Sequence, residues 1–232
     1  MSMAKKSANV YSALGASNHA TGERAQYDLY CTHPKAVEEL LKLEKFSNCI
    51  WEPCDGLGHI SDTLINRGYD VRRSDIITRN RGIEQLDFLI YDGKEWQGDI
   101  ITNPPYSCAT DMVRKALSVV ADGCKVAMWL RILFLESKHR QKLFREFPPK
   151  RIWVSSSRIE CGKNGVFGKG SPQGYMWLIW EKGYKGETKN RLVLTMSRPM
   201  AWGEEYYPKK VNVKARRNER ISKTDDIRIA PK

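Results

Sequence analysis

Short apolar runs alternate along the chain with segments in which apolar residues recur at helical spacing. The runs that predict strands are 49–51, 69–73, 99–102, 125–130, 151–155 and 175–180. The segments that predict helices begin at Pro34 and continue at 59–67, 108–121 and 137–147. Strands that alternate with helices in this way are typical of an α/β fold with a mainly parallel sheet.

Two unusual turns directly follow predicted strands, at 52–58 and at 103–106. In open parallel sheets, ligands bind beyond the carboxyl ends of the strands, where both of these turns fall. Both turns are therefore candidates for a ligand site.

The first turn, Glu52-Pro-Cys-Asp-Gly-Leu-Gly58, places an acid at a strand end and glycines at the start of a helix. Glycines let the backbone approach a ligand closely, but an acid this near repels phosphate. A cationic ligand with an amino group and a hydroxylated ribose fits better. Asp75, about 20 residues on, occupies the position that binds ribose hydroxyls. A tight structural turn explains the glycines equally well when this motif is taken alone.

The second turn, Asn103-Pro-Pro-Tyr106, combines an amide, two prolines and an aromatic ring at one strand end. Two consecutive prolines cannot continue a strand ladder, so the chain must turn there. The Asn103 amide oxygen and the Pro104 carbonyl can accept both N–H bonds of an exocyclic amine, whose lone pair is otherwise delocalised into its ring. A nitrogen held in this way, in line with an electrophile, needs no general base before it attacks.

Together the two turns resemble those of class I S-adenosylmethionine-dependent methyltransferases of the amino-methylating branch. The Asn-Pro-Pro-Tyr form of the second turn is similar to the motif of the enzymes that methylate adenine N6. Further segments resemble the small phage- and prophage-type DNA adenine methyltransferases, namely 15–19, 24–34, 155–158 and 175–183. The resemblance implies a Rossmann-like fold, a mainly parallel seven-stranded sheet with helices on both faces. We expect a catalytic domain over 31–200, between an N-terminal extension (1–30) and a C-terminal tail (201–232) in which Lys and Arg crowd together.

The resemblance implies a role for each motif residue as well. The residues expected to bind S-adenosylmethionine are Thr32, Glu52, Pro53, Gly56, Gly58, Asp75, Asp87 and Phe88. Among them, Thr32, Glu52 and the glycines would hold the methionine end and Asp75 the ribose, while Asp87 and Phe88 would hold the adenine. The catalytic set would be Asn103, Pro104, Pro105 and Tyr106, with Tyr106 stacked on the target base.

The charge of the chain favours a polyanion as partner. There are 39 Lys and Arg against 27 Asp and Glu, a net charge of +12. The candidates for contact with the target base or DNA lie on or beside a Gly- and Lys-rich loop and are Arg158, Lys163, Phe167 and Lys169. Simple solvation of the loop explains these cations equally well. Tyr175 and Trp177 are alternatives to Phe167 as the second ring around a flipped base.

Several classes of protein are excluded or disfavoured. No apolar run approaches the roughly 18 residues of a membrane span, and the N-terminus is too polar for a signal peptide. The six cysteines form no Cys-x-x-Cys pair, which disfavours a zinc site and a disulfide framework, so no metal is expected. Reduced thiols indicate the cytoplasm, here of a bacterial or phage-infected cell.

The sequence therefore predicts an enzyme that transfers a methyl group from S-adenosylmethionine to the N6 amine of adenine in DNA. The alternatives are the same chemistry on RNA adenine or on a protein glutamine, and a catalytically silent relative that only binds nucleic acid. The chain leaves no room for a large target-recognition domain, so the sequence does not indicate the target site, and it leaves the oligomeric state open.

Overall fold

The computed structural model describes residues 29–79, 82–159, 161–163, 165–167 and 173–193. The basic tail expected from residue 201, nearly all of the expected N-terminal extension and Lys169 lie outside the described residues. The domain boundaries drawn from the sequence therefore stay predictions.

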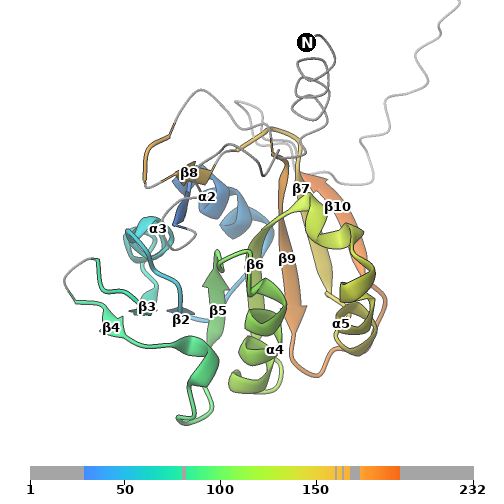
Figure 1. The fold of residues 1–232 in the computed structure, drawn as a ribbon, viewed down its shortest axis with the longest axis horizontal. Helices are drawn as coiled ribbons and strands as arrows, with labels where there is room; N and C mark the ends of the chain where they lie inside the picture. The colour runs from blue at the N-terminus through green and yellow to red at the C-terminus, as the bar shows by residue number, and fades with distance from the viewer. Residues whose placement is uncertain (1–28, 80–81, 160, 164, 168–172, 194–232) are drawn as a thin grey trace, which may run out of the picture. The chain divides into compact units, whose positions relative to one another are not determined.

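The core of the described chain is one twisted sheet (Figure 1). Its strands, in spatial order, are β10 (Lys189–Val193), β7 (Arg151–Ser155), β9 (Tyr175–Glu181), β6 (Lys125–Arg131), β5 (Asp99–Thr102), β2 (Cys49–Glu52), β3 (Asp70–Asp75) and β4 (Glu84–Gln85). Neighbouring strands are parallel except that β9 runs antiparallel to both β6 and β7. The expected α/β fold with seven mainly parallel strands is confirmed, and the two-residue β4 adds an eighth strand at one edge.

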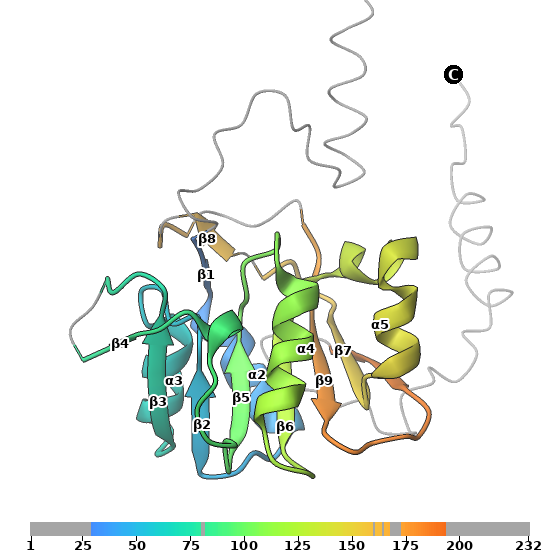
Figure 2. The ribbon, with the colours of Figure 1, turned by 60° about the horizontal axis from the view of Figure 1, so that its bottom comes forward.

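Helices cover both faces of this sheet, as the sequence predicts (Figures 1 and 2). One face carries α2 (Pro34–Leu43) and α3 (His59–Asn66), and the other carries α4 (Ala109–Val119) and α5 (Gln141–Glu146). Successive strand residues point to opposite faces. Trp51 accordingly packs in the cluster that contains α4, whereas Ile50 packs in the cluster that contains α2 and α3.

The helix expected over 137–147 is shorter than predicted. Ser137 has an extended backbone (φ −110°, ψ 129°), so two 3₁₀ turns, η3 (Ile132–Glu136) and η4 (Lys138–Arg140), precede α5. The Arg140 side chain donates hydrogen bonds to the carbonyls of Leu133 and Phe134. These bonds supply partners for two carbonyls of η3, outside the expected helix.

A second, two-stranded sheet was not predicted from the sequence. It pairs β1 (Tyr30–Thr32) with β8 (Cys161–Lys163) in antiparallel register, with Cys31 opposite Gly162. Figure 2 shows this pair at the end of the main sheet to which the arrows of β2, β3 and β5 point. The pair therefore lies at the edge where the two unusual turns of the sequence also fall.

Asp99 fixes the beginning of β5 in the sheet. Its side chain is buried (4% exposed) and accepts hydrogen bonds from the backbone N–H groups of Ser47 (2.6 Å) and Lys125 (2.6 Å). One carboxylate thus joins the segments that lead into β2 and β6 to the strand between them.

We expect Asp99→Ala to lower the free energy of unfolding by about 3 kcal/mol, because it leaves two backbone donors without their charged acceptor. Urea denaturation measures this loss. The control is Asp70→Ala at the start of β3, where the side chain is exposed, and its effect should stay within about 0.5 kcal/mol. Equal losses in the two variants would contradict the role given to Asp99.

Candidate active site

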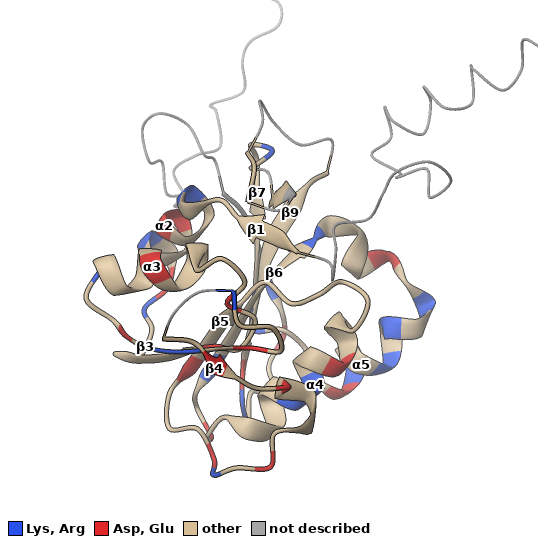
Figure 3. Ribbon diagram, turned by 60° about the vertical axis from the view of Figure 1, so that its left-hand side comes forward, with Lys and Arg blue, Asp and Glu red and all other residues tan. Residues whose placement is uncertain are grey.

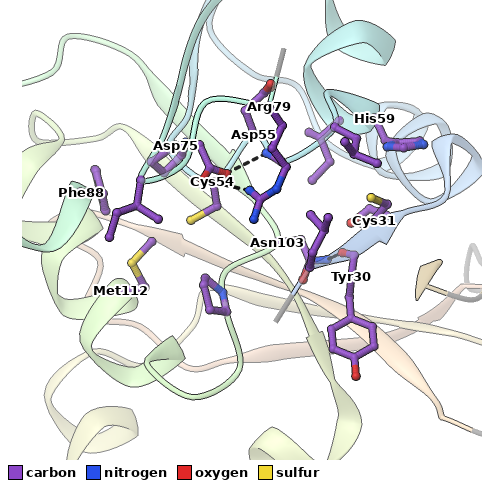
Figure 4. Close-up of a pocket in the computed structure, with 18 of the residues that line it drawn as sticks. Tyr30, Cys31, Cys54, Asp55, His59, Asp75, Arg79, Phe88, Asn103 and Met112 are labelled. Atoms are coloured by element: carbon purple, nitrogen blue, oxygen red, sulfur yellow. Dashed lines mark hydrogen bonds and ion pairs between the residues drawn. The ribbon is translucent and has the colours of Figure 1, made fainter. Parts of the chain in front are cut away.

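The carboxyl ends of β2, β3 and β5 surround an open pocket with an empty volume of about 920 Å³, its mouth included. In Figure 4, Phe88 and Met112 lie at one end of this pocket, and Asn103 and Tyr30 lie at the other. Asp75 and Arg79 lie between the two ends. The pocket is therefore elongated, with an apolar end and a polar end.

The glycine-rich turn forms the wall beside Asp75. The Asp75 carboxylate accepts hydrogen bonds from the backbone N–H of Gly56 (2.8 Å) and of Ile77 (2.9 Å), and it faces Arg79 at 3.4 Å. Gly58 has a positive φ of 87°, and a Cβ there would lie 2.6 Å from the Arg73 side chain. The positive φ favours glycine at this position, which directly precedes α3.

Glu52 joins the ends of β2 and β5 beneath the pocket. One of its carboxylate oxygens accepts hydrogen bonds from the Thr102 hydroxyl (2.5 Å) and from the Cys54 N–H (2.9 Å). The side chain is fully buried, and its other oxygen has no partner. Burial, helped by the charges of Asp55 and Asp75, raises the pKa of Glu52 well above its usual range.

Asn103 follows β5, lines the pocket and carries a side-chain acceptor without a partner. Its Nδ2 donates to the backbone carbonyl of Tyr30 at 2.6 Å, while its Oδ1 is buried without a partner. A carbonyl oxygen can only accept, so this contact fixes which end of the amide is the nitrogen. The Asn103 oxygen is therefore left available for a donor that enters the site.

Tyr106 belongs to a group of aromatic rings behind Asn103. Its ring centroid lies 5.8 Å from that of Tyr30 and 6.5 Å from that of Tyr175, whose ring in turn stacks on Trp129. Burial chiefly raises the pKa of Tyr106 well above its usual range and that of Tyr175 to about 12. Both hydroxyls therefore stay protonated at neutral pH.

The structure brings eight of the twelve residues predicted to bind the cofactor or to act in catalysis to this one pocket. Those that line it are Thr32, Pro53, Gly56, Asp75, Asp87, Phe88, Asn103 and Pro105. Four predicted residues lie beside the pocket rather than in its lining, namely Glu52, Gly58, Pro104 and Tyr106. The Asp87 side chain caps the 3₁₀ turn η2 (Phe88–Ile90) through the Leu89 N–H (2.9 Å), which places the Phe88 ring.

Of the residues predicted to contact the target base or DNA, Phe167 is the one whose ring contacts the structure describes, and they do not include Tyr106. The Phe167 ring packs edge-on against His33 (5.0 Å) and His59 (5.3 Å) rather than against Tyr106. Arg158 lies in the exposed segment after β7. Lys163 lies in β8 opposite Tyr30, and Lys169 falls outside the described residues. Tyr30 and Tyr175, not Phe167, are the rings that lie beside Tyr106.

Sequence reasoning missed several residues of the site. Arg79 and Met112 line the pocket, and Tyr30 and Arg131 lie against Tyr106. Of these, only Arg79 carried a signal, since it stands four residues after Asp75. The others reach the site through tertiary contacts alone.

The buried polar side-chain atoms that lack a hydrogen-bond partner in the described residues all lie in or beside this site. They are Thr32 Oγ1, Glu52 Oε2, His59 Nδ1, Asn103 Oδ1 and Arg131 Nε. Burial lowers the pKa of His59, so its ring is neutral. Native proteins leave few such atoms unpaired, and a cluster of them indicates a place where a ligand completes the hydrogen bonding.

The described residues contain neither a candidate metal site nor a helix that could span a membrane. No group of three or more His, Cys, Asp and Glu side chains there could hold a metal ion. No helix among them has the length and apolar character that crossing a membrane requires.

The fold is similar to that of class I methyltransferases. A Listeria monocytogenes protein assigned as a class I S-adenosylmethionine-dependent methyltransferase aligns with a TM-score of 0.52 at 13% identity, over 82% of this chain and 72% of that one. A Pyrococcus horikoshii protein assigned as an RNA methyltransferase aligns with a TM-score of 0.50 at 14% identity, over 75% of this chain and 98% of that one.

A third similar structure is a Vibrio vulnificus protein assigned as the modification subunit of a type I restriction enzyme. It aligns with a TM-score of 0.53 at 11% identity, over 97% of this chain. This chain covers only 57% of that longer protein. No protein-family model matches the sequence, and no curated protein sequence matches it significantly.

We expect Glu52→Gln to raise the melting temperature of the unliganded protein by a few degrees at pH 7. The pKa of Glu52 is higher in the folded protein than its usual value of 4.5, which applies to the unfolded chain. As the pH rises above 4.5, Glu52 ionises in the unfolded chain but stays protonated in the folded protein. The free energy of unfolding therefore falls as the pH rises. The neutral amide removes this cost. Thermal melts from pH 4 to pH 8 test the prediction, and the difference between the proteins should vanish at the acidic end. A variant that is less stable at every pH would contradict it.

Proposed function

We propose that this protein transfers a methyl group from S-adenosylmethionine to the N6 amine of adenine in DNA. The observation that carries the proposal is the Asn103 amide, which presents an unpartnered oxygen at the polar end of the pocket. The Tyr30 carbonyl holds the amide in that orientation.

S-adenosylmethionine would lie along the length of the pocket. Phe88 and Met112 offer apolar contacts to an adenine, and Asp75 offers a carboxylate to ribose hydroxyls. Thr32 and Asp55 line the pocket where the cationic methionine end would lie. The Asp55 carboxylate is itself ion-paired with Arg73 at 3.0 Å. The bound cofactor would supply an electrophilic methyl group on its sulfonium. The fold that the chain shares with methyltransferases supports this cofactor.

Asn103 and Pro104 would activate the amine that receives the methyl group. Their oxygens would accept its two N–H bonds and favour a pyramidal nitrogen with an available lone pair. Because the methyl group replaces one hydrogen, a single proton leaves the nitrogen for solvent after transfer. Most of the rate enhancement would come from orientation and from these fixed dipoles.

The charge distribution supports a nucleic acid as the source of the adenine. Lys and Arg occur on α5 and on the turn before it, the segment that follows β6 (Figure 3). The basic residues of this segment are Lys138, Arg140, Lys142 and Arg145. A nucleic-acid substrate also agrees with the assignments of two structural neighbours. RNA adenine, a protein glutamine and binding without catalysis are the alternatives.

We expect Asn103→Ala to lower kcat for methylation of unmodified DNA by about a thousandfold, because it removes an acceptor aimed at the amine. Radiolabelled S-adenosylmethionine measures the rate, and calorimetry should show cofactor affinity within about threefold of the original. Asn66→Ala, at the exposed end of α3, is the matched control and should leave the rate unchanged.

The same assay separates the alternatives. Label found only in RNA or only in protein would overturn the DNA assignment. Cofactor binding with no label in any substrate would favour the catalytically silent relative. No binding of S-adenosylmethionine would overturn the enzyme proposal altogether.

We expect Asp75→Asn to weaken the binding of S-adenosylmethionine by about 10- to 100-fold, because a neutral amide replaces a charged acceptor for the ribose hydroxyls. Calorimetry measures the dissociation constant. Asp70→Asn, at the other end of β3, is the matched control and should bind the cofactor normally. Equal affinity in the two variants would contradict the ribose contact.

A further inference from the structure

Arg131 is the last residue of β6. It lies beside Tyr106, the ring on which the target base would stack. Its guanidinium carbon lies 4.4 Å from the centroid of the Tyr106 ring and 5.8 Å from that of Tyr30. In the β6–β9 ladder it stands opposite Tyr175, whose hydroxyl it faces. Three tyrosines thus surround one cation.

No ion pair to Arg131 occurs within the described part of the chain, although the side chain is partly buried and its Nε is buried without a partner. Arg72 differs from Arg131 in having an acidic partner. Arg72 also lies over an aromatic ring, at 3.9 Å from Trp51, but it pairs with Glu84 at 2.9 Å. A partly buried cation loses hydration, and contact with aromatic rings offsets only part of that loss. Arg131 therefore has capacity left for an anion.

We propose that Arg131 binds a backbone phosphate of the nucleic-acid strand that carries the target base. This inference rests on the proposed function, since it is the base stacked on Tyr106 that would bring a phosphate into reach. A guanidinium suits phosphate because its N–H groups match two oxygens at once, and each nucleotide supplies a phosphate at a fixed distance from its base. A glutamine side chain in a protein would bring no such anion with it.

The test is the binding of a fluorescent 20-nucleotide DNA containing adenine, measured by anisotropy at several salt concentrations. Arg131→Gln should weaken binding about tenfold at low salt. It should also lower the slope of log affinity against log salt by about 0.7 to 0.9, which corresponds to one lost phosphate contact. Arg131→Lys keeps the charge and should keep the slope. The affinity for S-adenosylmethionine should not change in either variant.

Two further variants serve as controls. Arg114→Gln removes a cation that also lies over an aromatic ring, 5.6 Å from Phe147, but that is paired with Glu146. It should leave the salt slope unchanged. Arg131→Met is a second neutral variant that keeps apolar packing on the rings, and it replaces Arg131→Gln if circular dichroism shows that the glutamine variant is unfolded.

The outcomes separate this inference from the proposed function. A salt slope unchanged in the neutral variants, or lowered equally in Arg131→Lys, would overturn the phosphate contact, even where the protein methylates DNA. A lowered slope restored by lysine would support the contact, even where the original protein transfers no methyl group. In the latter case the enzyme proposal fails while the anion site stands.

Discussion

The site depends on the parallel pairing of β2 with β5, in which Ile50 lies opposite Asp99 and Trp51 opposite Ile100. Because the two strands run in the same direction, both end at one edge of the sheet, and their turns meet there. The hydrogen bond from the Thr102 hydroxyl to Glu52 joins these ends directly. A slip of one residue would turn every side chain of a strand to the opposite face. The hydrogen bonds that Asp99 accepts from the backbone N–H groups of Ser47 and Lys125 hold β5 in register with its neighbours.

The elements of the main sheet could be predicted because their signals are local. Apolar runs marked β2, β5, β6 and β9, and the consecutive prolines after Asn103 marked the end of β5. The pairing of β1 with β8 could not be predicted. Each strand has only three residues, and the two lie far apart in the sequence. Neither is long enough to show the alternation of apolar and polar residues that distinguishes a strand from a loop. For the same reason the sequence did not indicate that Tyr30, rather than Phe167, lies beside Tyr106.

The geometry of the pocket works against the stability of the unliganded fold. The unpartnered oxygens of Thr32, Glu52 and Asn103 each lose hydration on burial without gaining a hydrogen bond. Such atoms persist only where the surrounding structure holds them in place, here two apolar clusters on opposite faces of the sheet. The same rigidity fixes the acceptors before a ligand arrives, so little reorganisation remains for the moment of binding.

The contact between the Tyr30 carbonyl and the Asn103 amide has a consequence for how this protein can diverge. Every amino acid supplies a backbone carbonyl, so the contact that orients Asn103 constrains no side chain at position 30. What it requires is the extended backbone of β1 and its ladder with β8. Substitutions that preserve this ladder are silent for amide orientation, whereas a proline that removes a ladder N–H is not. The contact would therefore escape any search that compares residue identities alone.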